Sequence, residues 1–93
     1  MIVIKSIVIG RGENADLRVD DQYASPRHCR IDQHSDGLFS ITDEGSMNGT
    51  YIRHAHHQHF FRVALGGTAY LRPGDVVRVG RTEIPWMKLG ATA

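Results

Sequence analysis

Gly45-Ser46-Met47-Asn48-Gly49-Thr50-Tyr51-Ile52 is a stretch in which a polar turn passes directly into a strand-like run. Its Asn-Gly pair favours a tight turn, because these residues accept the positive φ angles that such turns require. The three residues that follow are β-branched or aromatic, which is typical of a β-strand. The polar side chains of the turn are therefore expected at the beginning of a strand, where a sheet would hold them in place.

Short apolar runs alternate with turn residues along the rest of the chain as well. No stretch has a sustained apolar pattern at helical spacing, and turn signals such as Ser35-Asp36-Gly37 and Pro73-Gly74-Asp75 separate the runs. The pattern predicts an all-β fold, a sandwich of two small antiparallel sheets. The expected strands include Ile7–Ile9, Leu17–Val19, Cys29–Gln33, Phe39–Asp43, Tyr51–Arg53, Phe61–Val63, Ala69–Arg72, Val76–Val79 and Ile84–Met87.

Length and composition limit the classes of protein that fit. The 93 residues make one domain with one modest core. The 11 Lys and Arg and the 10 Asp and Glu are interspersed, so no basic block favours nucleic acid or an anionic membrane as partner. No run approaches the roughly 20 apolar residues that cross a bilayer, and the amino terminus reads as a strand, not a signal peptide. The single cysteine, Cys29, excludes an internal disulfide and indicates a reducing, cytoplasmic setting.

Two more polar clusters, Gly10-Arg11 and Ser25-Pro26-Arg27-His28, also lie where strand-like runs end. A guanidinium such as that of Arg11 matches the oxygens of a phosphate, and a serine hydroxyl can donate to one. The amide of Asn48 offers a donor and an acceptor to a peptide backbone. Taken singly, each residue also fits an ordinary loop or turn, so no one of them decides a function.

Catalysis is the weakest interpretation of these residues. His28 lies three residues after Ser25, where it would serve as the base of a hydrolase-like pair. No acidic partner stands at a recognisable spacing, so an enzyme is not expected. Cys29 is next to His28, but its strand position, with Ile31 on the same face, favours a buried apolar role over a reactive thiol.

Together, in this order and at this spacing, the clusters resemble the forkhead-associated (FHA) domain. The resemblance implies an FHA-like β-sandwich of two antiparallel sheets with about eleven short strands. It also implies that loops at one end bind phosphothreonine peptides, so that the domain mediates phosphorylation-dependent protein–protein interaction in signalling. The match is strongest over residues 7–86, and its motifs are Ile9-Gly10-Arg11, Ser25-x-x-His28, Gly45-Ser46-x-Asn48-Gly49-Thr50-Tyr51-Ile52 and Leu71-Arg72-Pro73-Gly74-Asp75-x-Val77-x-Val79-Gly80.

The resemblance assigns roles to the matching residues. Arg11 corresponds to the arginine that contacts the phosphate and Ser25 to the serine that hydrogen-bonds it. Asn48 corresponds to the asparagine that contacts the peptide main chain just beyond the phosphothreonine. The implied partner is a protein phosphorylated by a Ser/Thr kinase, and no cofactor is expected. The residues expected to support the loops are Gly10, His28, Gly49 and Thr50.

Two residues depart from the family pattern near the ligand. Pro26 follows Ser25 where a polar or basic residue is frequent, and Met47 precedes Asn48 where a side chain that reaches the phosphate is frequent. Neither side chain can donate a hydrogen bond. Arg27 and Met47 remain candidates for additional contacts. With one charge-assisted donor fewer, binding would be weaker by roughly tenfold or more, and a phospho-independent scaffold domain on the same fold is the alternative.

The amino-terminal end also departs from the family, which has a fuller first strand and turn before its Gly-Arg strand. Only Met1 to Ser6 precede the matching strand here. We therefore expect residues 1–93 to form a single FHA-like domain with an abbreviated first strand, or to be a fragment of a longer protein.

A histidine cluster, formed by His54, His56, His57 and His59, has no counterpart in these motifs. Imidazoles bind Zn²⁺ and Ni²⁺, so a metal-binding module is a second alternative. On a strand, however, His54 and His56 would share one face and the other two the opposite face, which leaves at most two ligands per face. An exposed hairpin without metal is therefore favoured, and the family topology would put it at the end of the sandwich opposite Arg11.

Overall fold

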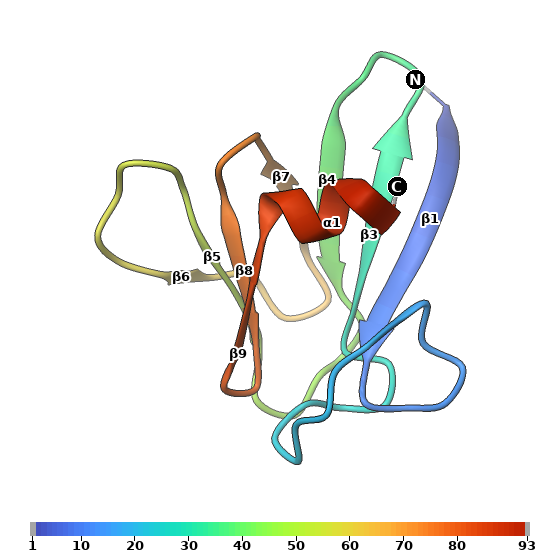
Figure 1. Cartoon of the computed structure of the whole chain (residues 1–93), viewed down its shortest axis with the longest axis vertical. Helices are drawn as coiled ribbons and strands as arrows, with labels where there is room; N and C mark the ends of the chain where they lie inside the picture. Colours follow the sequence, from blue (N-terminus) through green and yellow to red (C-terminus); the bar gives the residue numbers. More distant parts are fainter. Residues whose placement is uncertain (1, 93) are drawn as a thin grey trace.

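The computed structural model describes residues 2–92, and the burial of side chains as far as Leu89. The described part is all-β except for one short helix at its carboxyl end, as Figure 1 shows. The predicted β-sandwich is confirmed, with nine strands where about eleven were expected. The elements are β1 (Val3–Gly10), β2 (Leu17–Arg18), β3 (Cys29–His34), β4 (Phe39–Asp43), β5 (Thr50–Arg53), β6 (Phe61–Arg62), β7 (Thr68–Leu71), β8 (Val76–Val79), β9 (Thr82–Pro85) and α1 (Trp86–Thr92).

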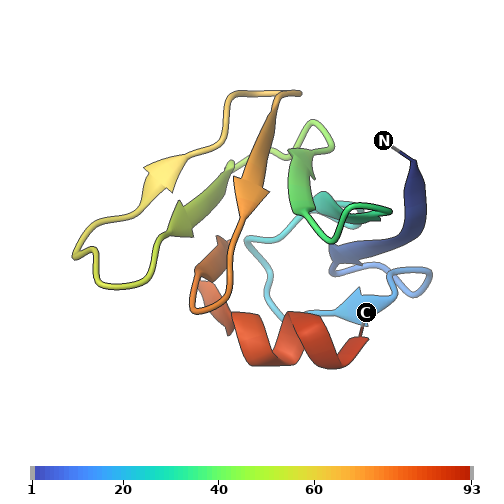
Figure 2. The same ribbon diagram turned by 90° about the horizontal axis from the view of Figure 1, so that it is seen from above.

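Two sheets form the sandwich, with strand orders β2-β1-β3-β4-β7 and β6-β5-β8-β9. In Figure 2, β5 and β6 lie on the left and β1 on the right. All neighbouring pairs are antiparallel except β1 and β2, which are parallel where Ile9 faces Leu17. The expectation of purely antiparallel sheets is therefore wrong at this edge. The cause is the loop after β1, which folds back along that strand so far that the Asp16 carboxylate accepts the N–H of Val8 at 2.7 Å.

The core lies between the sheets, where alternate residues of the central strands meet. Ile9 and Ile41 enter it from the five-stranded sheet, and Ile52 and Val77 enter it from the four-stranded sheet. All four side chains are fully buried. The loops at the ends of these strands are therefore attached to a packed framework.

The last predicted strand, Ile84–Met87, ends early, because β9 stops at Pro85 and α1 begins at Trp86. The Trp86 ring packs edge-on against Phe39, with centroids 4.9 Å apart, and Leu89 belongs to the buried core. Seven residues are too few for a helical period to stand out in the sequence, so this helix depends on tertiary packing. No helix within residues 2–92 is long and apolar enough to cross a membrane.

The amino-terminal residues extend β1 and do not form a separate strand. β1 pairs with β3 from Val3↔His34 to Ile9↔Cys29, with a register shift between Val3 and Lys5. The first half of β1 is exposed and the second half is buried. The expectation of an abbreviated strand before the Gly-Arg strand is therefore wrong for the described residues, and this accounts for part of the smaller strand count.

The packing of α1 predicts a clear difference between two of its residues. Leu89→Ala removes a buried side chain and is expected to lower the free energy of unfolding by about 2–4 kcal/mol. Met87→Ala truncates a side chain that is 83% exposed, so a change of less than about 0.5 kcal/mol is expected. Urea denaturation followed by the fluorescence of the single tryptophan measures both values. Equal stability of the two variants would contradict the docking of α1 on the core.

Candidate functional site

Five connections meet at one end of the sandwich, the lower end in Figure 1. They are the β1–β2 loop (11–16), the β2–β3 loop (19–28), the β4–β5 loop (44–49), the β6–β7 loop (63–67) and the β8–β9 turn (80–81). The backbone N–H groups of Arg11 and Met47 donate to the carbonyl and the hydroxyl oxygen of Ser25, at 3.0 and 3.1 Å. Asn48 Nδ2 donates to the carbonyl oxygen of Tyr23 at 2.7 Å. Hydrogen bonds thus bring Arg11, Ser25 and Asn48 together from three loops.

Arg11 keeps most of its donors available. Its Nε–H donates to the carbonyl oxygen of Ala24 at 3.0 Å, which fixes the direction of the side chain. The side chain is exposed, and among the described residues no protein group accepts from its two terminal nitrogens. This leaves a fork of N–H groups, the geometry that suits bidentate contact with a phosphate or carboxylate.

All the polar groups of Ser25 form hydrogen bonds within the protein, except that its hydroxyl proton is not donated. Its N–H donates to His28 Nδ1 at 3.0 Å, and its carbonyl oxygen accepts from Arg11. Its Oγ accepts the N–H of Met47, and the hydroxyl proton is given to no described protein group. The hydroxyl is therefore placed beside Arg11 with one hydrogen bond left to donate.

His28 is fully buried and connects two of the loops. Because Nδ1 accepts the N–H of Ser25, the ring proton is assigned to Nε2, which donates to the carbonyl oxygen of Gly49 at 2.7 Å. Both ring nitrogens are thus used by the backbone, and neither is left to accept the proton of the Ser25 hydroxyl. A hydrolase-like pair of Ser25 and His28 does not fit this geometry.

Two glycines allow the backbone to approach closely at the site. A Cβ on Gly10 would lie 2.1 Å from the carbonyl oxygen of Pro26. Gly49 has a φ of +89°, and a Cβ there would lie 2.8 Å from the Nε of Arg62. A larger residue at Gly10 would push the loops apart, and one at Gly49 would be strained by the positive φ and would displace the Arg62 side chain. Pro26 has a structural contact of its own, because its carbonyl oxygen accepts the N–H of Gly12 at 3.1 Å.

The β4–β5 loop is organised by Asp43, a residue that the motif comparison did not single out. Asp43 is buried, and its Oδ1 accepts the hydroxyls of Ser46 at 2.5 Å and Thr50 at 2.8 Å. Its Oδ2 accepts the N–H groups of Gly45 and Ser46 at 3.2 and 3.3 Å. Ser46 Oγ also accepts the N–H of Gly49. An aspartate at a strand end, followed by a turn, is the sequence signal that could have revealed this anchor.

The same hydrogen bonds control the ionisation of Asp43. Burial raises the pKa of its carboxyl group, but the hydroxyls of Ser46 and Thr50, with backbone N–H groups, outweigh this effect and hold the pKa below its ordinary value of 3.8. Asp43 is therefore a buried carboxylate whose charge is stabilised locally by donors of its own loop.

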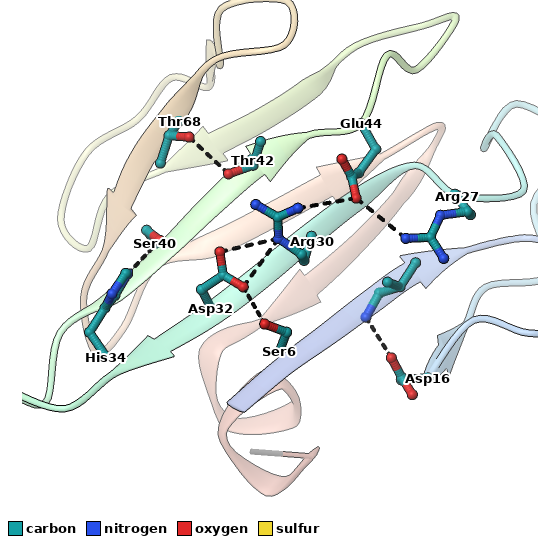
Figure 3. Close-up of polar contacts among 11 residues, drawn as sticks. Ser6, Asp16, Arg27, Arg30, Asp32, His34, Ser40, Thr42, Glu44 and Thr68 are labelled. Carbon is teal, nitrogen blue, oxygen red and sulfur yellow. Dashed lines mark hydrogen bonds and ion pairs between the residues drawn. The ribbon is translucent and has the colours of Figure 1, made fainter. Parts of the chain in front are cut away.

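The two candidates for additional contacts, Arg27 and Met47, lie at the edge of the site. The guanidinium of Arg27 lies 3.5 Å from Glu44, which also pairs with Arg30, as Figure 3 shows. The Met47 side chain is 86% exposed, and it is the backbone N–H of this residue that contacts Ser25. In this arrangement Arg27 pairs with Glu44, and Met47 contributes its backbone N–H.

The histidine cluster lies in the β5–β6 loop, at the far end of β5 from Gly49 (Figure 1). The argument from two strand faces was therefore wrong, because the chain leaves the sheet after Arg53 and residues 54–60 are irregular. His54 Nδ1 lies 2.8 Å from Oδ2 of buried Asp75, and His56 has a φ of +66°. No group of three or more potential metal ligands occurs among the described residues.

Cys29 is confirmed as a buried core residue. Its side chain is fully buried between the sheets. Burial raises the pKa of the thiol to about 12, with a further contribution from the nearby charge of Asp43. The thiol is therefore protonated at neutral pH and is a poor nucleophile.

The anchoring of Asp43 predicts a dependence of stability on pH. Because its pKa is lower in the folded state, its contribution is present above the ordinary value of 3.8 and is lost as pH falls through the folded value. At pH 7, Asp43→Asn is expected to reduce the free energy of unfolding by roughly 1.5–3 kcal/mol. The exposed Asp20→Asn should change it by less than about 0.5 kcal/mol.

Urea denaturation of wild type and both variants at pH 7 and near pH 3 tests this dependence. The difference between wild type and Asp43→Asn should shrink at the lower pH. The pKa of Asp21 is also held low, mainly by its hydrogen bond from Thr82. The free energy of unfolding of Asp43→Asn is therefore still expected to fall at low pH. A difference that is the same at both pH values would contradict the assignment of a buried carboxylate.

Comparison with known proteins supports the resemblance noted in the sequence. The family model for the FHA domain matches residues 7–80. FhaB of Mycobacterium tuberculosis is 35% identical over 78 residues, which is 84% of this chain and 44% of that protein. The amino-terminal FHA domain of Saccharomyces cerevisiae Rad53p, solved with a phosphothreonine peptide, is 26% identical with a TM-score of 0.68, over 84% of this chain and 58% of that one.

A second solved structure is more fully covered. The FHA domain of FhaA in complex with the intracellular domain of Rv3910 is 29% identical with a TM-score of 0.70, over 91% of this chain and 82% of that one. The chain spans less than half the length of the mycobacterial FhaB proteins that it matches. The family match, the sandwich and the position of the loop motifs agree, and the chain belongs to the FHA domain family.

Proposed function

We propose that this FHA domain binds peptides containing phosphothreonine and thereby mediates phosphorylation-dependent protein–protein interaction in signalling. One observation carries the proposal. Arg11 and Ser25 lie side by side with unused donors, and buried His28 ties the Ser25 backbone to the loop of Asn48. The Rad53p domain, solved with a phosphothreonine peptide, has the same fold and supports this assignment.

The proposed mechanism is local and electrostatic. A phosphate with a charge of about −1.5 to −2 docks against the terminal nitrogens of Arg11 and the hydroxyl proton of Ser25. Asn48 donates to Tyr23 through Nδ2, and its Oδ1 is not engaged by the described protein groups, so it can accept an N–H of the peptide backbone. Because the loops are already hydrogen-bonded to one another, little conformational entropy is lost on binding.

The residues next to Ser25 and Asn48 add no charged donor for the phosphate. Pro26 and Met47 offer no side-chain donor, and Arg27 is engaged with Glu44. A charge-assisted hydrogen bond contributes about 1.5–3 kcal/mol, so a site with one such bond fewer is weaker by roughly tenfold or more. We therefore infer a modest affinity in which Arg11 provides most of the phosphate dependence.

The proposed partner is a protein phosphorylated by a Ser/Thr kinase, and the interaction needs no cofactor, nucleic acid or membrane. FHA domains are interaction modules, and we assign no catalytic activity to this one. We place it in the cytoplasm, where ATP-dependent kinases act and an unpaired cysteine such as Cys29 stays reduced.

Arg11→Ala is the variant that tests the phosphate site. We expect it to weaken binding of a fluorescent phosphothreonine peptide by roughly 10- to 100-fold in fluorescence anisotropy, because it removes the guanidinium whose backbone is hydrogen-bonded to Ser25. Arg72→Ala is the matched control. It removes the same charge from the exposed β7–β8 turn, next to Leu71, which pairs with Phe39 at the far end of β4.

The unphosphorylated form of the same peptide completes the test. Wild type should bind it far more weakly than the phosphorylated form. Equal affinity for the two peptides would contradict phosphate recognition and favour the phospho-independent scaffold. Equal loss in Arg11→Ala and Arg72→Ala would mean that only the general charge of the domain matters.

A further inference from the structure

The outer face of the four-stranded sheet carries arginines that are stacked on aromatic rings. Cζ of Arg78, on β8, lies 4.5 Å from the centroid of the Tyr51 ring and 4.8 Å from that of the Phe60 ring. Cζ of Arg53, on β5, lies 5.3 Å from the Phe60 centroid. Both arginines alternate with buried residues of their strands, so their side chains are on the outside of the sandwich. The ring of Phe60 thus has both guanidinium groups as neighbours.

Phe60 is placed by a loop that a buried carboxylate holds. Oδ2 of buried Asp75 lies 2.8 Å from Nδ1 of His54, and its Oδ1 accepts the N–H of Ala55 at 3.2 Å. The N–H of His57 donates to the carbonyl oxygen of His54 at 3.0 Å, which folds the loop into a turn. The β5–β6 loop is therefore attached to the beginning of β8, and its ring contacts the arginines without the help of a ligand.

The two stacked arginines have no acidic partner. Within residues 2–92, neither Arg53 nor Arg78 forms an ion pair, and no protein group accepts a hydrogen bond from either guanidinium. Glu83 lies opposite Arg78 on β9, but the Arg78 guanidinium is turned the other way, over Tyr51 of β5. Arg62 faces Tyr51 from β6 and adds a third positive charge to the same face.

The other sheet shows how an arginine on a sheet face is neutralised within this chain. There Arg30 pairs with Asp32 at 3.1 Å and with Glu44 at 3.5 Å, as Figure 3 shows. On the four-stranded sheet, rings cover part of each guanidinium and leave the N–H groups at its edge without a protein acceptor. Such an edge suits the two oxygens of a carboxylate. The face therefore offers two donors, held in place, to the acidic side chains of a partner.

We propose that the outer face of β5 and β8 is a second docking surface, which binds an acidic segment of a partner protein through Arg53 and Arg78. Alternate side chains of an extended segment point to the same side and lie about 6.5–7 Å apart. Two alternate Asp or Glu residues can therefore contact both guanidinium groups. This surface goes beyond the proposed function, because the contact requires no phosphothreonine.

The composition of the face favours this partner over two others. Arginine and aromatic side chains are the residues that contribute most at protein interfaces. The same face of a second copy would bring arginines against arginines, which is repulsive. A nucleic acid would stack its bases on exposed rings, but here the rings of Tyr51 and Phe60 are already stacked with guanidinium groups.

Two fluorescent peptides, neither of them phosphorylated, test the inference. One carries Glu at four alternate positions with Ser between them, and the other carries Gln in place of Glu. In fluorescence anisotropy at low ionic strength, wild type is expected to bind the Glu peptide about 2- to 20-fold more tightly, the range of two exposed ion pairs. The ratio of affinities should fall at high ionic strength, because salt screens exposed charges.

Variants assign the effect to the stacked arginines. Arg53→Gln and Arg78→Gln are each expected to lower the ratio, and the double variant should lose most of it. Arg72→Gln is the matched control, because Arg72 is also an exposed arginine without an ion pair in the described part of the chain, yet is stacked on no described ring. It should keep the wild-type ratio. Since the ratio is measured within each variant, a change in overall stability does not mimic the result.

Four outcomes overturn the inference. They are equal affinity of wild type for the two peptides, an equal loss of the ratio in Arg72→Gln and Arg78→Gln, and a ratio that is lost in Arg11→Ala but kept in the double variant, which would put the acidic peptide at the phosphate site. The fourth is tighter binding of a uridine oligonucleotide of the same charge than of the Glu peptide, which would exclude a protein as the preferred partner. The phosphothreonine peptides that test the proposed function are a separate measurement, so either conclusion can fail alone.

Discussion

The buried imidazole of His28 is the interaction on which the binding end depends. It accepts the N–H of Ser25 and donates to the carbonyl oxygen of Gly49, so one ring sets the distance between the β2–β3 loop and the β4–β5 loop. Arg11 is attached to the same point, since its N–H donates to the carbonyl oxygen of Ser25. A substitution of His28 that removes either contact would leave a buried backbone group without a hydrogen-bond partner. The free energy of unfolding would then fall by about 1–3 kcal/mol.

Two buried carboxylates likewise hold neighbouring connections together through hydrogen bonds. Asp43 gathers the donors of the β4–β5 loop, and Asp21 joins the β2–β3 loop to the β8–β9 turn. Among the described residues, no buried side-chain nitrogen or oxygen lacks a hydrogen-bond partner. Polar groups buried in this way specify one arrangement, because any other arrangement leaves them unsatisfied. The loops are irregular in conformation, yet buried hydrogen bonds specify how they are arranged.

Local patterns predicted those parts of the molecule that depend on local chemistry. Alternation and turn residues located the central strands, and the ordered spacing of Arg11, Ser25 and Asn48 indicated the family. The helix α1 was missed because it depends on contacts of Trp86 and Leu89 with the core. The hydrogen bonds that Asp21 accepts from Arg81 and Thr82 were missed for a similar reason. These partners are 60 and 61 residues away in the sequence, and no short motif encodes such a contact.

The distribution of cations at this end of the sandwich bears on the proposed function. A phosphate contributes more to affinity as more charged donors surround it, and the guanidinium held beside Arg11 is that of Arg18, whose Nε donates to the Arg11 carbonyl oxygen at 3.1 Å, while Arg27 pairs with Glu44. Arg81 is held near Asn48, because it contacts Asp21 and Tyr23 and the carbonyl oxygen of Tyr23 accepts Asn48 Nδ2. Specificity is a difference between affinities, so a phosphate contact that two phosphopeptides share cancels in their comparison. On the proposed function, the residues around the phosphothreonine therefore decide which phosphorylated proteins this domain selects.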